Sequence, residues 1–195
     1  MNAITLMLID DEANVLSSLQ RLLRRRPPVP GRPCTVEVYT SPLAAIHAAQ
    51  QRTIDAVVCD YRMPELDGVE TLRRLKEVQP QTARILLSGS REFDTVVDAI
   101  NVAHVARIVI KPWGDDELLA AIADAVETRR LRLENAELAD QLRIQEGLLS
   151  RQEAELRRLE GLWPGITRVE WADDGSVCMT QTDVLNTSFG RIPPR

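Results

Sequence analysis

Cysteine, aromatic residues and long apolar runs are all scarce in this sequence of 195 residues. The three cysteines are far apart and odd in number, so they form neither a disulfide framework nor a Cys-x-x-Cys zinc pattern, and they favour a reducing, cytoplasmic setting. Aromatic residues make up 4% of the chain, which leaves few platforms for stacking single-stranded nucleic acid. No apolar run reaches the roughly 18 residues of a membrane span, and the start, MNAITLMLID, lacks the basic region of a signal peptide.

An excess of basic charge is also missing. The chain has 24 Lys and Arg against 29 Asp and Glu, and its net charge of −5 argues against a nucleic-acid partner. The hydrophobic fraction of 44% is typical of a globular protein, and the length fits one domain with an appendage. We therefore expect a folded chain rather than a disordered one.

Short apolar runs alternate with helical patterns over about the first 128 residues. The runs are nearly continuous rather than alternating, which predicts strands buried on both faces. They are ITLMLI (4–9), CTVEVY (34–39), IDAVVC (54–59), ARILLS (83–88) and ARIVI (106–110). The helical patterns cover residues 13–26, 42–51, 68–78 and 92–102. This order predicts an α/β fold with a five-stranded parallel sheet and helices on both faces.

Charged and hydroxyl residues stand at the ends of the predicted strands. Asp10 and Asp11 follow the first strand, Asp60 follows the third, Ser88 ends the fourth and Lys111 follows the fifth. In a parallel sheet these ends lie on one edge, where ligand crevices form. Converging carboxylates need a cation, and hard oxygen ligands suit Mg²⁺. A lysine and a hydroxyl beside them suit a phosphoryl group, so the edge predicts metal-assisted phosphoryl transfer to Asp60.

Four stretches carry a resemblance to a known family. LIDDE (8–12), VVCDYRMPELDG (57–68), ILLSG (85–89) and IVIKPW (108–113) occur in order, each at a strand end. Residues 3–128 resemble the receiver domain of two-component response regulators. The resemblance implies a flavodoxin-like doubly wound sheet with strand order 2-1-3-4-5, and it assigns residues 1–128 to this domain.

The same resemblance implies a ligand set. Asp60 would accept a phosphoryl group from a phosphohistidine on a sensor histidine kinase or phosphotransfer protein. Asp11 and Asp60 would bind Mg²⁺ directly, Asp10 would act mostly through water, and the backbone carbonyl of Arg62 would complete the set.

The end of the fifth strand brings one agreement with the family and one departure. Lys111 would pair with the phosphoryl oxygens and Ser88 would turn inward to donate a hydrogen bond to them, and the family often has a cis peptide before the residue at Pro112. The family usually has Tyr or Phe where this chain has Ile108, so an aromatic switch is not expected here. The run Lys-Pro-Trp (111–113) resembles receivers that precede HD-GYP phosphodiesterase domains, but no His-Asp dyad or Gly-Tyr-Pro follows.

From Asp115 the composition is that of a long helix. One seam has steps of four and three residues, a heptad repeat over more than four heptads: Leu131, Asn135, Leu138, Leu142, Gln145, Leu149, Gln152, Leu156, Leu159 and Trp163. We expect one helix from Asp115 to Glu160, roughly 70 Å long, of which residues 129–160 form a coiled coil continuous with the last receiver helix.

The seam and Asn135 favour a parallel homodimer through residues 131–163. The flanking charges do not, because the pairs at 134–139, 141–146, 148–153 and 155–160 include no attractive one. An antiparallel pair and a helix of another protein remain open alternatives.

Residues 161–195 predict a small hairpin at 166–179, with Asp174-Gly175 in its turn, and a flexible tail. No effector domain is recognisable. We therefore expect a signalling switch that passes its state through a dimeric coiled coil to a protein partner, with no catalysis beyond phosphoryl transfer to its own Asp60 and autodephosphorylation. The alternatives are a coiled-coil phosphatase or a pseudo-receiver scaffold acting on another signalling protein. A DNA-binding regulator has less support, because residues 129–195 hold ten Arg and eleven acidic residues and no helix-turn-helix pattern.

Overall fold

The computed structural model describes residues 3–89, 101–145, 147 and 150–164. It contains a five-stranded sheet in the order β2-β1-β3-β4-β5, and every neighbouring pair is parallel. The strands are β1 (Ile4–Ile9), β2 (Cys34–Tyr39), β3 (Ala56–Asp60), β4 (Ala83–Ser88) and β5 (Arg107–Ile110). The predicted fold class and strand order are confirmed, and the predicted strands differ from these by at most two residues at an end.

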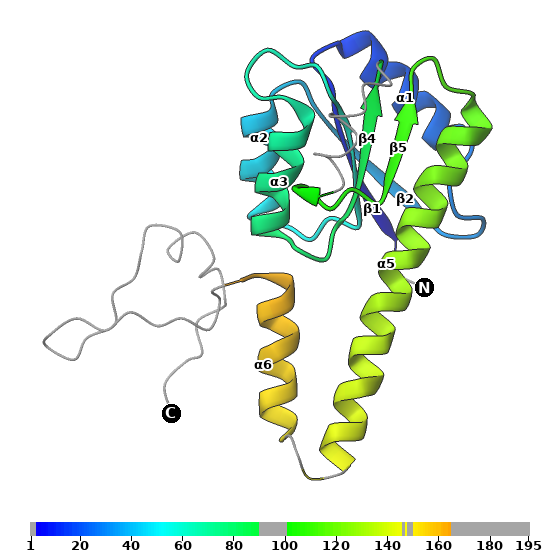
Figure 1. Cartoon of the computed structure of the whole chain (residues 1–195). Helices are drawn as coiled ribbons and strands as arrows, with labels where there is room; N and C mark the ends of the chain where they lie inside the picture. The colour runs from blue at the N-terminus through cyan, green and yellow to red at the C-terminus, as the bar shows by residue number, and fades with distance from the viewer. Residues whose placement is uncertain (1–2, 90–100, 146, 148–149, 165–195) are drawn as a thin grey trace, which may run out of the picture. The chain divides into compact units, whose positions relative to one another are not determined.

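Helices cover both faces of the sheet (Figure 1). Helix α1 (Ala13–Arg25) and helix α5 (Asp115–Gln145) lie on one face, and α2 (Pro42–Ala49) and α3 (Gly68–Val78) lie on the other. The core accordingly divides into two clusters, which share the sheet between them because alternate residues of each strand point to opposite faces. The helix predicted at 92–102 falls almost entirely outside the described residues.

Two helices begin as their sequences dictate. Ser41 accepts a hydrogen bond from the backbone N–H of Ala44 at 3.4 Å, and Pro42 occupies the first turn of α2, as predicted. Asp67 caps α3 by accepting from the N–H of Glu70 at 2.8 Å. This second cap fixes the start of α3 directly after the loop that follows Asp60.

The expected single helix from Asp115 to Glu160 is wrong. Helix α5 ends at Gln145, and a separate helix α6 runs from Arg151 to Leu162. Gly147 has a φ of 72°, a left-handed conformation that cannot continue a helix. Ser150 and Glu153 then form a capping box, in which each side chain accepts from the other residue's backbone N–H, so the local sequence starts a new helix. The heptad pattern of apolar residues continues across Gly147 and the capping box, so periodicity alone did not predict the break.

Helix α6 lies beside the part of α5 that extends below the sheet and runs in the opposite direction (Figure 1). Its end approaches the loop before β4, where a Cβ added to Gly161 would lie 3.9 Å from Nε2 of Gln81. The predicted helix end at Glu160 lies two residues before the observed end of α6 at Leu162. The predicted hairpin at 166–179 and tail at 180–195 lie outside the described residues.

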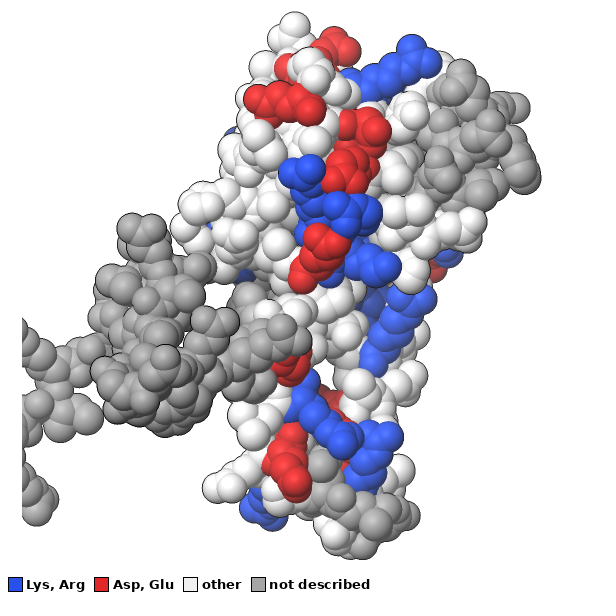
Figure 2. Space-filling model, turned by 60° about the vertical axis from the view of Figure 1, so that its left-hand side comes forward, with Lys and Arg blue, Asp and Glu red and all other residues white. Residues whose placement is uncertain are grey.

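Charges of both signs alternate over the face that carries α2 and α3 (Figure 2). On α3, Glu70 pairs with Arg73 and Arg74, and Arg73 also pairs with Glu77. This face therefore offers no stripe of one sign for a polyanion. None of the helices that the structure describes combines the length and apolarity needed to cross a bilayer.

Candidate functional site

Asp60 stands at the carboxyl end of the central strand β3 and is held at both oxygens. Its Oδ1 lies 2.6 Å from Nζ of Lys111, and its Oδ2 accepts a hydrogen bond of 2.9 Å from the backbone N–H of Arg62. The Asp60 side chain is 8% exposed, so one rim of the carboxylate remains open to a small reactant. The chain has thus fixed a nucleophilic carboxylate at the crevice edge of the sheet.

Asp10 lies at the end of the neighbouring strand β1 and is buried. Its Oδ1 accepts from the N–H of Glu12 at 2.9 Å, and its Oδ2 lies 3.4 Å from Nζ of Lys111. The lysine ammonium therefore stands between two carboxylates that would otherwise repel each other. The structure brings together three of the predicted site residues, Asp10, Asp60 and Lys111, as the strand-end argument requires.

The pKa directions follow from this arrangement. Burial raises the pKa of Asp10, and the opposing effects of the Glu12 hydrogen bond and the Lys111 charge do not cancel it. Burial alone would lower the pKa of Lys111, but its hydrogen bond to Asp60 and the charges of both carboxylates raise it. Lys111 is thus a firmly charged cation, whereas Asp10 is a buried carboxylate that one ammonium compensates only partly.

The remaining predicted residues occupy the rim. Ser88 is buried at the end of β4, and its carbonyl accepts a 2.7 Å hydrogen bond from the N–H of Lys111. Asp11 and the side chain of Arg62 are exposed. Among the described residues, no three acidic, histidine or cysteine side chains are grouped at metal-binding distances. The donors that do meet there are carboxylate oxygens next to a buried, incompletely compensated charge, which is the chemistry that Mg²⁺ accepts.

Two features of the site were not expected from the sequence. The Trp113 ring lies under the lysine, with Nζ of Lys111 5.7 Å from its centroid, a distance that allows a cation–π contact. Gly68 lies so near the loop after β3 that an added Cβ would stand 2.2 Å from the carbonyl oxygen of Asp60. The Asp-Gly pair at 67–68 signals a turn, but only the fold reveals the close approach. The Lys111–Pro112 bond is cis, as the family resemblance implied.

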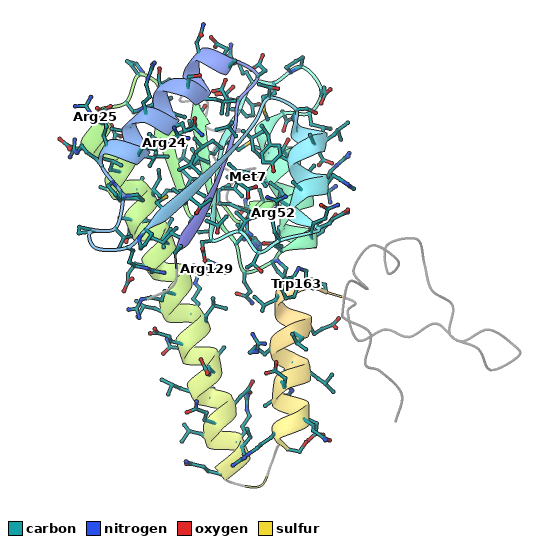
Figure 3. The ribbon with its side chains drawn as sticks, turned by 180° about the vertical axis from the view of Figure 1, so that it is seen from behind. Met7, Arg24, Arg25, Arg52, Arg129 and Trp163 are labelled. Atoms are coloured by element: carbon teal, nitrogen blue, oxygen red, sulfur yellow. The ribbon has the colours of Figure 1, made fainter. Side chains whose placement is uncertain are left out.

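A groove of about 1230 Å³ opens beside the site, between α1 and the segment from Lys111 to Asp115. Its floor is apolar, and arginines of α1 line its rim; Figure 3 labels Arg24 and Arg25 on α1. The lining residues include Val15, Leu19, Leu22, Trp113, Arg21, Arg24, Arg25 and Arg26. These arginines therefore border the same groove as Lys111 of the phosphoacceptor edge.

Ile108 lies in β5 beside Leu86 of β4 and packs against the core cluster under α2 and α3. It occupies the position where the family usually has an aromatic ring. The side chain is half-buried and apolar, so it has no hydroxyl with which to move between a core and a solvent position.

A doubly wound parallel sheet with two aspartates and a lysine at its carboxyl edge defines a class of phosphoryl-accepting signalling domain. The chain belongs to the family of response regulator receiver domains, which residues 6–123 match. Among solved structures it resembles the signal receiver domain of an HD domain-containing protein from Pseudomonas fluorescens Pf-5. The two share 30% identity with a TM-score of 0.62, over 69% of this chain and 94% of that one.

The curated relatives extend the comparison. The hydrogenase transcriptional regulatory protein HoxA of Bradyrhizobium diazoefficiens is 29% identical over 130 residues, 67% of this chain but 25% of its own length. The response regulator protein TodT of Pseudomonas putida is 28% identical over 154 residues, 79% of this chain and 65% of its own. This chain spans about a quarter of the length of HoxA. HoxA and the protein ZraR of Klebsiella oxytoca are named as transcriptional regulatory proteins, and the match covers about a quarter of the length of each.

Proposed function

We propose that this chain is a phosphorylation-dependent switch that accepts a phosphoryl group on Asp60 and passes its state to a protein partner through α5 and α6. The single observation that carries the proposal is the ion pair of 2.6 Å between Lys111 and Asp60, with Asp10 bridged to the same ammonium. A carboxylate held beside a permanent cation at a parallel-sheet edge is suited to receive a phosphoryl group and to have its new charge neutralised.

Mg²⁺ fits the donor set. Asp10, Asp11 and Asp60, with the backbone carbonyl of Arg62, would hold it; all four supply hard oxygen ligands from two adjacent loops. When bound, Mg²⁺ would neutralise charge on the phosphoryl oxygens. The partly compensated burial of Asp10 supports this assignment, because a divalent ion would offset the charge that Lys111 alone does not.

The transfer balances within this chain and its donor. An Asp60 carboxylate oxygen attacks the phosphorus of a phosphohistidine; a P–O bond forms, the P–N bond breaks, and the electron pair returns to the imidazole. Lys111 then pairs with the phosphoryl oxygens, and the Ser88 hydroxyl donates to one of them. In autodephosphorylation, water attacks the same phosphorus, the P–O bond to Asp60 breaks, and inorganic phosphate leaves, which restores the carboxylate. These two reactions are the only catalysis that we assign to the chain.

The donor is a sensor histidine kinase or a phosphotransfer protein, acting in the cytoplasm. Its phosphohistidine must reach Asp60 from outside, and the groove along α1 opens at Lys111 with an apolar floor and an arginine rim. An acidic donor surface with apolar side chains would match both properties. We place donor docking on this groove.

The output runs through α5 and α6 to another protein, and the sequence-based expectation of a parallel homodimer through 131–163 becomes part of this proposal, although the helix break removes its continuous form. The names of HoxA and ZraR favour a second candidate, a receiver that regulates transcription. Binding of the chain to double-stranded DNA, weakening steeply with salt, would support that candidate over protein-mediated output.

Intact mass after incubation with Mg²⁺ and a small phosphodonor tests the proposal. The wild type should gain one phosphoryl group, and Asp60→Asn should gain none. Removal of Mg²⁺ with a chelator should abolish the gain. If no donor or kinase adds a group to the wild type, the chain is a pseudo-receiver, and the phosphatase and scaffold alternatives take precedence; loss of phosphate from an added partner receiver would identify the phosphatase.

A further inference from the structure

Helix α5 has two opposite apolar sides below the sheet. On one side Leu133 and Ile144 are half-buried, and among the described residues α6 is the helix that packs against α5 below the sheet. On the other side Leu131, Leu138 and Leu142 are 47%, 56% and 59% exposed. With roughly 100° per residue, these three leucines and Asn135 fall within one narrow stripe, and positions 133, 140 and 144 fall about half a turn away. Helix α6 therefore covers one side of α5 and leaves the leucine stripe open.

We propose that a second copy of this chain covers the stripe Leu131–Asn135–Leu138–Leu142, with the two α5 helices parallel and in register and each α6 on the outer side. This inference rests on the proposed function, because it names the contact through which the switch would act. It narrows the pairing predicted from sequence to α5, since α6 packs on the opposite side and cannot join the same seam.

Asn135 argues for a second copy and for the parallel direction. In a parallel, in-register pair, Asn135 meets Asn135 of the other copy, and the two amides can satisfy each other. The antiparallel register that matches Leu131 with Leu142 places Asn135 against Leu138, which buries an amide without a partner. A self-matching polar position in an apolar stripe is thus best satisfied by an identical helix.

The charges beside the stripe also favour a parallel, in-register pair. In the parallel register Glu127 of one helix faces Arg132 of the other, across the upper end of the seam. Glu127 is 47% exposed at its side chain and already pairs with Arg130 in its own helix, so it can serve as one member of a shared network. The next pair, Glu134 with Ala139, is neutral. Because the first pair attracts and the second does not repel, the two α5 helices can approach closely along this stretch.

Three leucines per copy form a short seam, so the dimer should be weak and should depend on concentration. A weak contact is one that a modest change in the attached receiver domain can make or break. Full burial of one leucine can change a dissociation constant by about tenfold or more.

The test uses the full chain, without phosphodonor, in sedimentation experiments over a range of concentrations. Leu138→Glu should weaken dimerisation by at least about tenfold. Leu156→Glu is the matched control, because Leu156 on α6 is 51% exposed and belongs to the predicted long seam but not to the α5 stripe. Helicity by circular dichroism should be unchanged in both. A monomeric wild type, no effect of Leu138→Glu, or equal effects of both variants would each overturn the proposal, the last in favour of a seam through α6.

Direction is tested by disulfide trapping in a Cys178→Ser background, with diamide as oxidant. Leu138→Cys should cross-link to itself in a parallel pair. A mixture of Leu131→Cys and Leu142→Cys chains should give only like-with-like products, and a mixed product would show antiparallel pairing and refute the proposed register. Phosphoryl uptake by Asp60 in Leu138→Glu, measured by mass, separates failure of this inference from failure of the proposed function.

Discussion

Arg129 of α5 reaches the loop before β3 and pairs with Asp55, with 2.6 Å between Nη1 and Oδ1. The two side chains are 11% and 22% exposed, and Oδ2 of Asp55 also accepts the N–H of Thr5 at 2.8 Å. Figure 3 shows Arg129 where α5 leaves the base of the sheet. The pair therefore fixes α5 to the edge opposite the phosphoacceptor, just before the helix extends away.

Replacement of this arginine should be costly. Arg129→Met leaves the part-buried Asp55 carboxylate without its cation, and the free energy of unfolding should fall by about 3 kcal/mol. Denaturant unfolding measures the change. Arg158→Met, which removes the exposed pair with Glu155, should lower it by less than about 0.5 kcal/mol. Equal losses in the two variants would show that the Asp55 pair does not anchor α5.

Gly68 should not accept a side chain. In Gly68→Ala the new Cβ meets the Asp60 carbonyl oxygen at 2.2 Å and the Tyr61 Cα at 2.9 Å, both backbone atoms, so the loop must move. We expect a loss of about 1–3 kcal/mol in unfolding free energy and slower phosphoryl uptake, because the loop also carries Arg62. Gly114→Ala is the control, since nothing lies within 4 Å of its added Cβ. A stable, fully active Gly68→Ala would contradict the described packing.

Trp113 should report on the site by fluorescence. Phosphorylation draws the Lys111 ammonium toward the new oxygens, and its distance of 5.7 Å from the indole centroid must change. Emission of the wild type should therefore change when Mg²⁺ and phosphodonor are added, and Asp60→Asn should not respond to the donor. Trp163→Phe should keep the response, whereas Trp113→Phe should lose it. A response that survives in Trp113→Phe would place the reporter elsewhere.

The groove along α1 predicts a difference between donors. Replacing both Arg24 and Arg25 by Glu reverses the charge of its rim, so phosphotransfer from a protein donor should slow by about tenfold or more. Uptake from a small phosphodonor should stay unchanged, since Asp60 and Lys111 are untouched. Arg151→Glu on the exposed start of α6 is the control and should affect neither rate. Equal slowing with both donors would mean that the change damages the site rather than docking.

The sequence predicted the fold well because its signals were local and repeated. The apolar runs at 4–9, 34–39 and 83–88 coincide with strands β1, β2 and β4, and the strand-end argument brought Asp10, Asp60 and Lys111 to one edge. The predicted burial on both faces is confirmed for β1, β3 and β4 but is wrong for the outer strands β2 and β5, which expose Thr35, Val38 and Arg107.

The prediction of one long helix from Asp115 to Glu160 was wrong for a different reason. A heptad seam runs unbroken from Leu131 to Trp163, but Gly147 and the Ser150 capping box break the backbone in the middle of it. Side-chain periodicity says which faces are apolar and nothing about whether the axis reverses. The positions of Trp113 and Gly68 depended on contacts between segments, which no local pattern encodes.

The two outer strands of the sheet both carry ion pairs. Glu37 of β2 pairs with Arg52 at 2.7 Å, and Arg107 of β5 pairs with Asp124 of α5. Outer strands expose backbone groups that can add a foreign strand, and charges placed there hinder such pairing. Charged side chains at these positions hinder the addition of a foreign strand to either edge of the sheet. A variant that neutralises Glu37 and Arg107 should lose soluble yield on refolding, although every group of the phosphoacceptor edge would remain in place.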